Sequence, residues 1–224
     1  MPTIAVVGAG PGLGLAVARA FGNRDYDVAL IARNQQRLDE LAATLSADGI
    51  RAEGFAADVL ERPSLTAALD RASSRFGAID VLEYSPVGSA STTGLASPAV
   101  STVQDVQQQI EFQLYGAMAA TAAVLRAMRE RGSGTVLITT GAGSIDPRPM
   151  LGNVNAAAAA LRNWTIGLHK ELADSGVYAA HVGIGVSIDT AVVPSVPVAP
   201  ATEIAESYWT LHTERRVPEF VFAR

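Results

Sequence analysis

Short apolar runs alternate along the whole chain with longer stretches in which apolar residues recur at helical spacing. The short runs are continuously apolar, which is typical of strands covered on both faces of a sheet. This alternation predicts repeated strand–helix–strand units around a mostly parallel sheet. The predicted strands are 3–7, 28–32, 52–56, 81–84, 135–139, 177–184 and, more weakly, 219–222. The predicted helices are 13–21, 35–47, 64–75, 103–131, 155–173 and 202–214.

The composition suits one compact domain. Of the 224 residues, 49% are hydrophobic and 17% are charged, which argues against disorder and allows a full core. Residues 1–224 are therefore predicted to form a single doubly wound α/β domain, with about seven strands and helices on both faces. Three prolines in 192–200 predict an extended loop.

Charge and residue usage exclude several classes of function. A formal net charge of -5 gives no reason to expect nucleic acid or an anionic membrane as a partner. No apolar run reaches the roughly 18 residues of a membrane helix. The first strand starts at once, without a signal-peptide pattern, so we expect a cytoplasmic protein. Cysteine is absent, and His169, His181 and His212 lack a ligand spacing, so no metal site is predicted.

The first predicted strand ends in a glycine-rich turn, Gly8-Ala9-Gly10-Pro11-Gly12-Leu13-Gly14, which leads into the first helix. Without side chains, backbone N–H groups can approach a pyrophosphate, and the helix N-terminus favours the negative charge. At the first strand–helix turn of a doubly wound chain, this pattern predicts a Rossmann-type dinucleotide site. The alternative is a turn that only packs the helix on the strand.

The glycine spacing resembles that of the short-chain dehydrogenase/reductase family, and the similarity extends through nearly the whole chain. Ala57-Asp58-Val59 matches the family's turn after the third strand, and 79–82 and 134–138 match its next two strands. Segment 188–190 is similar to the family's later cofactor loop, with one residue inserted and a proline missing, and 204–206 resembles its late helix. The resemblance implies a cofactor site made by Gly8, Gly10, Gly12, Leu13, Gly14, Arg33, Asp58, Val59 and Thr190.

The end of the second strand bears on which nicotinamide dinucleotide is bound. A carboxylate there selects NAD, whereas an arginine accommodates the 2′-phosphate of NADP. The chain has Arg33 and no acid at this place, which favours NADP(H) over NAD(H). Arg33 as a solvent-exposed residue at a helix start remains the alternative. The resemblance places Asp58 against the adenine amine, while a turn-forming aspartate remains open.

The catalytic tetrad of the family has diverged at every position in this alignment. The asparagine position corresponds to Gln113 and the serine position to Thr140. The tyrosine and lysine positions correspond to Val154 and Ala158, and Lys170 is the only lysine of the chain. Because a positioned general acid is worth about 10²- to 10⁴-fold in rate, this loss matters. Thr140 keeps a hydroxyl and is the candidate catalytic residue, and Tyr84, Tyr115, Asn153 and Asn155 are nearby polar alternatives.

Two interpretations of the function stay open. The first is an atypical oxidoreductase of a carbonyl or alcohol, and the second is a non-catalytic nucleotide-binding sensor, regulator or partner subunit. A weaker third keeps the fold without a nucleotide. The substrate loop of the family is shortened here to 191–201, and the alanine-rich helices 117–124 and 156–161 match the family's subunit interface. We therefore expect a homodimer or homotetramer.

Overall fold

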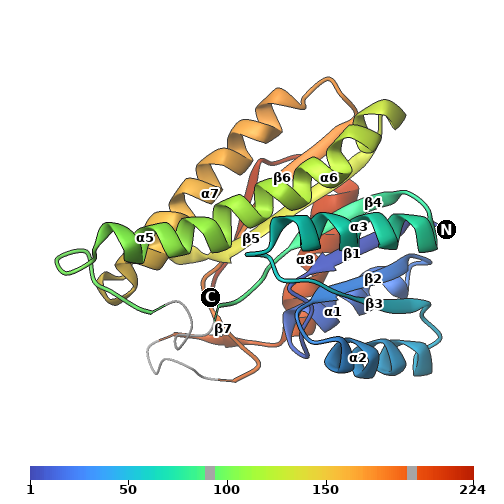
Figure 1. Ribbon diagram of the computed structural model, residues 1–224, viewed down its shortest axis with the longest axis horizontal. Coiled ribbons are helices and arrows are strands. Elements are labelled where there is room, and N and C mark those ends of the chain that lie inside the picture. The colour runs from blue at the N-terminus through green and yellow to red at the C-terminus, as the bar shows by residue number, and fades with distance from the viewer. Residues whose placement is uncertain (89–93, 191–195) are drawn as a thin grey trace.

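The computed structural model describes residues 1–88, 94–190 and 196–224, and its centre is a seven-stranded sheet (Figure 1). All pairings in this sheet are parallel, and the strand order is β3-β2-β1-β4-β5-β6-β9. The strands are β1 (Thr3–Val7), β2 (Asp27–Ala32), β3 (Ala52–Ala56), β4 (Ile79–Tyr84), β5 (Gly134–Gly141), β6 (Val177–Ile184) and β9 (Glu219–Phe222). The predicted doubly wound fold is confirmed.

Helices cover both faces of the sheet, and each face has its own apolar core. One core joins the sheet to α1, α2 and α8, and the other joins it to α3, α6 and α7 (Figure 1). The helices are α1 (Leu13–Gly22), α2 (Gln35–Ala47), α3 (Arg62–Phe76), α5 (Val103–Ile110), α6 (Gly116–Arg131), α7 (Gly152–Glu171) and α8 (Ala201–Glu214). None of the helices in the described ranges is long and apolar enough to cross a membrane.

The predicted continuous helix 103–131 is wrong in its middle. A π-helical turn, η1 (Glu111–Tyr115), separates α5 from α6. The buried Tyr84 side chain reaches this turn, where its hydroxyl donates to the Phe112 carbonyl at 3.0 Å. A side chain that takes a helical carbonyl widens the turn locally. Sequence periodicity does not detect this contact, because Tyr84 lies on another element.

The prediction of an extended loop at 192–200 needs correction where the structure can test it. Residues 191–195 lie outside the described residues, but β8 (Val198–Ala199) pairs in parallel with β7 (Ser187–Ile188). The Ser187 N–H donates to the Pro197 carbonyl at 2.8 Å, and the Asp189 N–H donates to the Ala199 carbonyl at 2.9 Å. The segment is extended because a distant partner supplies its hydrogen bonds.

Two buried asparagines near the start of α7 connect it to neighbouring loops. Asn153 accepts from the Ala96 N–H at 3.1 Å and donates to the Gly94 carbonyl at 3.2 Å. Asn155 donates to the Arg148 carbonyl at 2.9 Å. α7 begins at Gly152, earlier than predicted, so these amides lie inside the helix and do not cap it.

Candidate functional site

A cleft of about 820 Å³ opens where the carboxyl ends of β1, β4 and β5 meet. The strand order reverses between β1 and β4, since the chain runs outward in both directions from this pair. In doubly wound folds, ligands bind at such a reversal, beyond the carboxyl ends of the strands. The glycine turn, the start of α2 and the N-terminal half of α7 all contribute to the lining.

The glycines of the turn have two different tasks. Gly8 has φ of +99°, and a Cβ there would lie 2.5 Å from the Pro86 nitrogen, so this position lets β1 and the loop after β4 approach closely. A Cβ at Gly14 would lie 3.0 Å from the Ala9 Cα. A Cβ at Gly12, the N-cap of α1, would have Asp189 Oδ2 as its nearest neighbour at 4.0 Å, and the first turn of that helix holds no acid. The arrangement is a backbone cradle suited to an anion.

Two arginines stand at the far end of the cleft. Arg33 follows β2 and Arg37 lies in the first turn of α2, and both are exposed and line the cleft. Within the described ranges, neither guanidinium forms an ion pair. The Asn34 side chain accepts from the Arg37 N–H at 3.1 Å and so caps α2. Sequence reasoning missed Arg37, although its place four residues after Arg33 on a predicted helix start was a usable signal.

Of the remaining predicted cofactor residues, two line the cleft and one does not. Asp58 and Val59 line the cleft. Asp58 Oδ1 also accepts from the Leu60 N–H at 3.0 Å. One oxygen of this carboxylate therefore forms the turn, as the alternative interpretation expected. Thr190 is exposed and outside the lining, which instead includes its neighbour Asp189. Asp189 has φ of +59° and accepts from the Ala201 N–H at 2.8 Å, which fixes the start of α8.

Gln113, Thr140 and Val154 come together in the inner part of the cleft. The Gln113 amide donates to the Val154 carbonyl at 3.3 Å and to the Gln109 side chain at 3.1 Å. Ala158 is buried one turn further along α7. Among the described residues lining the cleft, the one tyrosine is Tyr84, whose hydroxyl is held by Phe112. Burial raises the pKa of Tyr84 far above its ordinary value, so this phenol is not a ready proton donor.

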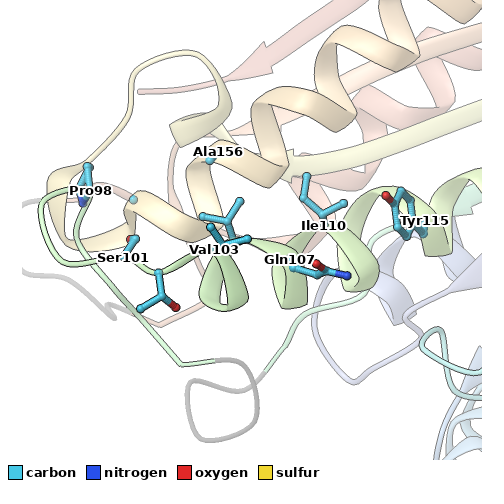
Figure 2. Close-up of a pocket in the computed structure, with 10 residues that line it drawn as sticks. Pro98, Ser101, Val103, Gln107, Ile110, Tyr115 and Ala156 are labelled. Carbon is cyan, nitrogen blue, oxygen red and sulfur yellow. The ribbon is translucent and has the colours of Figure 1, made fainter.

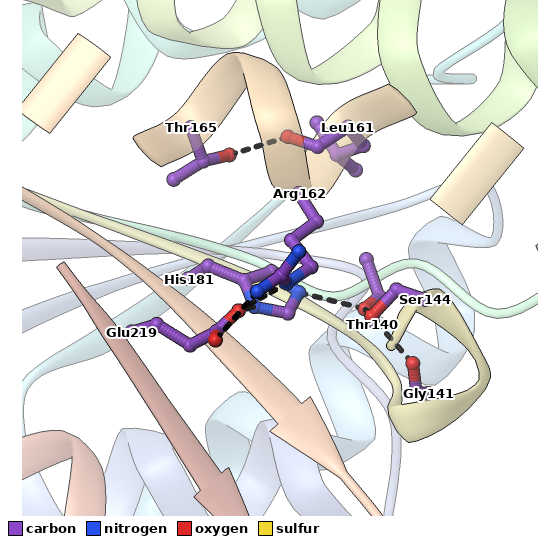
Figure 3. A network of polar contacts seen from close by, with 8 residues as sticks. All are labelled: Thr140, Gly141, Ser144, Leu161, Arg162, Thr165, His181 and Glu219. Atoms are coloured by element: carbon purple, nitrogen blue, oxygen red, sulfur yellow. Dashed lines mark hydrogen bonds and ion pairs between the residues drawn. The ribbon is translucent and has the colours of Figure 1, made fainter. Parts of the chain in front are cut away.

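Thr140 leads from the cleft into a buried polar network (Figure 3). Its hydroxyl oxygen lies 2.8 Å from His181 Nε2 and 3.0 Å from the Ser144 hydroxyl. His181 Nδ1 lies 3.1 Å from a Glu219 carboxylate oxygen, and Arg162 forms a bidentate pair with the same carboxylate. Sequence reasoning missed His181, Glu219 and Arg162, because these residues come from three separate elements and share no motif.

A second polar cluster lies on the opposite face of the sheet, around the fully buried Glu83. The Ser85 and Thr139 hydroxyls each donate to its carboxyl group at 3.0 Å, and the Tyr208 hydroxyl lies 2.7 Å from that of Thr139. Burial raises the pKa of Glu83 to about 8, against the lowering effect of the two hydroxyl contacts. Ser85 and Thr139 also line the cleft.

A second hollow, of about 640 Å³, lies beside α5 and the start of α7 (Figure 2). Its lining is largely apolar and includes Val103, Val106, Ile110, Tyr115 and Ala156. Figure 2 shows Val103, Ile110 and Ala156 among the side chains that line this hollow. It contains no cluster of titratable side chains, and in the described part of the chain no group of three His, Asp or Glu residues is placed to hold a metal.

Comparison with known protein families identifies the family of this chain. Residues 2–197 match the family described as short chain dehydrogenase. The chain belongs to this family. The predicted resemblance is thereby confirmed at the level of the family.

The relatives vary in how much of their length is matched. The chain is 33% identical over 132 residues to D-threitol dehydrogenase from Mycolicibacterium smegmatis, which covers 59% of this chain and 49% of that protein. It is 30% identical over 174 residues to 2-(S)-hydroxypropyl-CoM dehydrogenase 3 from Xanthobacter autotrophicus, covering 78% and 67%. The matched part of the chain thus spans about half to two thirds of these curated relatives.

Solved structures agree over almost the whole chain. L-sorbose reductase from Gluconobacter frateurii, complexed with NADPH and L-sorbose, aligns with a TM-score of 0.87 at 21% identity, covering 99% of this chain and 95% of that one. An alcohol dehydrogenase from Thermococcus sibiricus, complexed with 5-hydroxy-NADP, aligns with a TM-score of 0.84 at 25% identity, covering 100% and 96%. At 21% identity, the alignment with L-sorbose reductase shows a shared fold alone.

Proposed function

We propose that this short-chain dehydrogenase binds NADP(H) and acts as an atypical oxidoreductase on an alcohol or carbonyl group. The observation that carries the proposal is a single cleft with an open glycine cradle in its floor and two arginines without ion-pair partners among the described residues at one end. Membership of the family supports the reaction class. Gly8, Gly10, Gly12, Leu13 and Gly14 would hold the pyrophosphate.

The residues around the cleft fit such a ligand along its length. Asp58 and Val59 line the part next to the arginines, where an adenine would lie, and Arg33 with Arg37 would hold a 2′-phosphate. When bound, the nicotinamide would supply the hydride chemistry. The chain would then have to position the substrate, exclude water and move one proton at the substrate oxygen, and Thr140 is the polar residue of the inner cleft that we assign to this contact.

Because of Arg33 and Arg37, we expect the protein to bind NADPH in preference to NADH. The double variant Arg33→Ala with Arg37→Ala is expected to weaken NADPH binding about tenfold or more, because hydrogen bonds to charged groups contribute about 1.5–3 kcal/mol. NADH has no 2′-phosphate, so its affinity should stay nearly unchanged. Titration of cofactor fluorescence measures both constants. Arg129→Ala, which removes an exposed charge on α6, is the matched control, and an equal loss for both cofactors in the double variant would contradict the assignment.

A non-catalytic sensor or regulatory subunit is the second candidate, and one observation favours it. Val154 and Leu161 of α7 present hydrocarbon to the cleft, where the family alignment expects the tyrosine and its surroundings. The two candidates differ in turnover. Purified protein is titrated with NADPH and then tested on a panel of aldehydes and ketones, and with NADP⁺ on alcohols. Saturable binding without turnover in either direction supports the sensor, and turnover supports the oxidoreductase.

We further propose that the chain self-associates through α5, α6 and the start of α7. Tyr115 and Met118 are 42% and 40% exposed, and the exposed Ala122 lies on the same side of α6. Exposed apolar and small side chains let helices of two subunits approach closely. The hollow between Val103 and Ala156 continues this surface (Figure 2).

The substitution Met118→Glu is expected to shift the protein toward monomer, since it places a charge in the middle of the proposed contact. Light scattering after gel filtration measures the mass directly. Val217→Glu, at a residue that is 39% exposed in the loop before β9, should leave the mass unchanged. A wild-type protein that is already monomeric at micromolar concentration would exclude the contact.

A further inference from the structure

Three neighbouring strands bring Thr140, His181 and Glu219 into one row. His181 of β6 is paired in register with Ile138 of β5 on one side and with Glu219 of β9 on the other. Thr140 lies two residues beyond Ile138, so its side chain points to the same face of the sheet. α7 covers this face and contributes Arg162 at the outer end (Figure 3). The row thus runs from the cleft to the far edge of the sheet.

The hydrogen bonds set the direction in which a proton can move. Arg162 keeps Glu219 ionised by hydrogen bonding, and it holds the pKa of this carboxyl below its ordinary value. An ionised carboxylate can only accept, so His181 carries its proton on Nδ1 and leaves Nε2 with a free lone pair. The Thr140 hydroxyl therefore donates to Nε2, at 2.8 Å. This order of hydroxyl, imidazole and carboxylate is that of an activated hydroxyl group.

The hydroxyl of Thr140 also keeps one place for a ligand. It has one proton and two lone pairs. The acceptors within reach of that proton are His181 Nε2 at 2.8 Å and the Ser144 hydroxyl oxygen and the Gly141 carbonyl, each at 3.0 Å, and His181 is the nearest of them. The lone pairs are left for a donor in the cleft, which Thr140 lines. A substrate hydroxyl group is such a donor.

We propose that Thr140 is the catalytic residue that accepts the proton of an alcohol substrate, with His181 and Glu219 as positioning residues that relay and stabilise it. This inference rests on the proposed oxidoreductase function. It assigns to a threonine and a buried imidazole on β5 and β6 the proton transfer that the family assigns to a tyrosine on α7. The substrate class is a secondary or primary alcohol small enough for the inner cleft.

The step balances in atoms and electrons. The alcohol loses a hydride from carbon to the oxidised nicotinamide dinucleotide and a proton from oxygen to Thr140, and its C–O bond becomes a carbonyl. At the same time, Thr140 gives its own proton to His181 Nε2, so the threonine stays neutral. The imidazolium formed is paired with Glu219. After the product leaves, the proton returns through Thr140 to water in the cleft.

The surroundings of His181 favour the base form of the relay. Burial lowers the pKa of His181 to about 4, with Arg162 also lowering it and Glu219 acting in the opposite direction. The groups that face this ring are Thr140 on β5, Ser144 on η2 (Ala142–Ser144), Glu219 on β9 and Arg162 through that carboxylate. His181 is thus neutral over the ordinary pH range, and its Nε2 carries no proton.

The Glu83 cluster is a weaker candidate for the same task. Ser85 and Thr139 also line the cleft, but both hydroxyls donate into a carboxyl group that burial keeps protonated near neutral pH. Among the described residues, the Thr139 hydroxyl also contacts Tyr208, whose pKa burial raises well above its ordinary value. This cluster has no strong acceptor for a proton that arrives from the cleft.

The arrangement of protons is tested first, without cofactor or substrate. Nitrogen chemical shifts of the histidine rings, assigned with His181→Gln, give the tautomer and pKa of His181. We expect the Nδ1–H tautomer at neutral pH, a change of the His181 signals in Thr140→Val, and near wild-type signals in Thr140→Ser. An Nε2–H tautomer, or signals that do not respond to Thr140→Val, would overturn the relay.

The kinetic test uses NADP⁺ with isopropanol, cyclohexanol, phenylethanol and D-threitol. Thr140→Val and His181→Gln are each expected to lower kcat about 10²-fold or more, while the dissociation constant of NADPH changes less than about threefold. Thr140→Ser should keep most of the activity. His212→Gln is the matched control, because His212 is half-buried and also hydrogen-bonded to a β5 threonine, Thr135, but it lies outside the cleft.

Each outcome is informative about a different claim. Failure of the wild-type protein to bind NADPH or NADH would exclude the proposed function itself. Cofactor binding without oxidation of any alcohol in the panel, or wild-type kcat in folded His181→Gln, would exclude the relay and leave the cofactor site standing. An equal loss in His212→Gln would assign the effect to stability.

Discussion

Replacing Gly12 with aspartate is expected to weaken binding of both NADPH and NADH by about 10³-fold while the fold is preserved. A Cβ at this position meets open space, with Asp189 Oδ2 nearest at 4.0 Å. Aspartate is also a favoured N-cap residue, and Gly12 is the N-cap of α1. The new carboxylate would face a pyrophosphate beside the carboxylate of Asp189. Like charges about 4 Å apart repel by about 4 kcal/mol at the effective dielectric constant of a protein surface.

Fluorescence titration gives the affinities, and thermal unfolding reports whether the variant is folded. Gly167→Asp is the matched control: a Cβ there also meets open space, but the residue lies on the exposed side of α7, away from the cleft. Its affinities should equal those of the wild type. If folded Gly12→Asp bound both cofactors normally, the glycine turn would be only a packing element, which is the alternative interpretation of its sequence.

The free energy of unfolding is expected to be highest near pH 6.5 and to fall by about 2 kcal/mol by pH 8, and Glu83→Gln should abolish that fall. Burial raises the pKa of Glu83 from 4.5 to about 8 in the folded protein. Between these values, the folded state binds a proton that the unfolded state does not. Stability from this group is therefore complete below pH 4.5 and is lost as pH rises to about 8.

Histidines produce the acid side of the same curve. Burial lowers the pKa of His181 and of His212 from 6.5 to about 4. The unfolded state thus takes up protons first as the pH falls below 6.5, and stability decreases toward pH 4. Below pH 6.5, the loss of stability from the two histidines is larger than the gain from Glu83. The free energy of unfolding therefore has its maximum near pH 6.5. In Glu83→Gln the acid side should become steeper, because the opposing contribution of Glu83 is gone.

Urea unfolding at a series of pH values measures both sides of the curve. Glu171→Gln removes a carboxylate from the exposed end of α7 and is the control for a change of net charge. Its curve should follow that of the wild type. A decline above pH 6.5 that persists in Glu83→Gln would mean that another group causes it.

Under the proposed function, the proton chemistry would lie on the sheet and not on α7. The positions of Val154 and Ala158 on α7 are apolar, and the polar groups that border the inner cleft come from the strands beneath. Sites built on strands are held more precisely than sites on loops. The proposed relay contains no tyrosine, so it would need no lysine to lower the pKa of a phenol.

Local sequence was sufficient for most of the elements, and most of the cofactor residues that it proposed line the cleft. Strands β1, β3, β6 and β9 and helix α2 have the bounds that periodicity predicts, because each is apolar on the side or sides that its layer requires. The glycine turn and Arg33 were identified because their chemistry depends on short spacings next to a strand end. The π-helical turn, the β7–β8 pair and the role of Arg37 in the cleft were not predicted.

What the sequence by itself determined about this protein is the doubly wound layering, the family and the place of the glycine turn after the first strand, since each follows from spacings of a few residues. What only the tertiary structure decided is the row of Thr140, His181, Glu219 and Arg162 and the complete burial of Glu83. Thr140 and Glu219 are 79 positions apart along the chain, and the register of the strands brings these side chains together. Their protonation depends on burial and on which neighbour donates a hydrogen bond, and the local sequence pattern reveals neither.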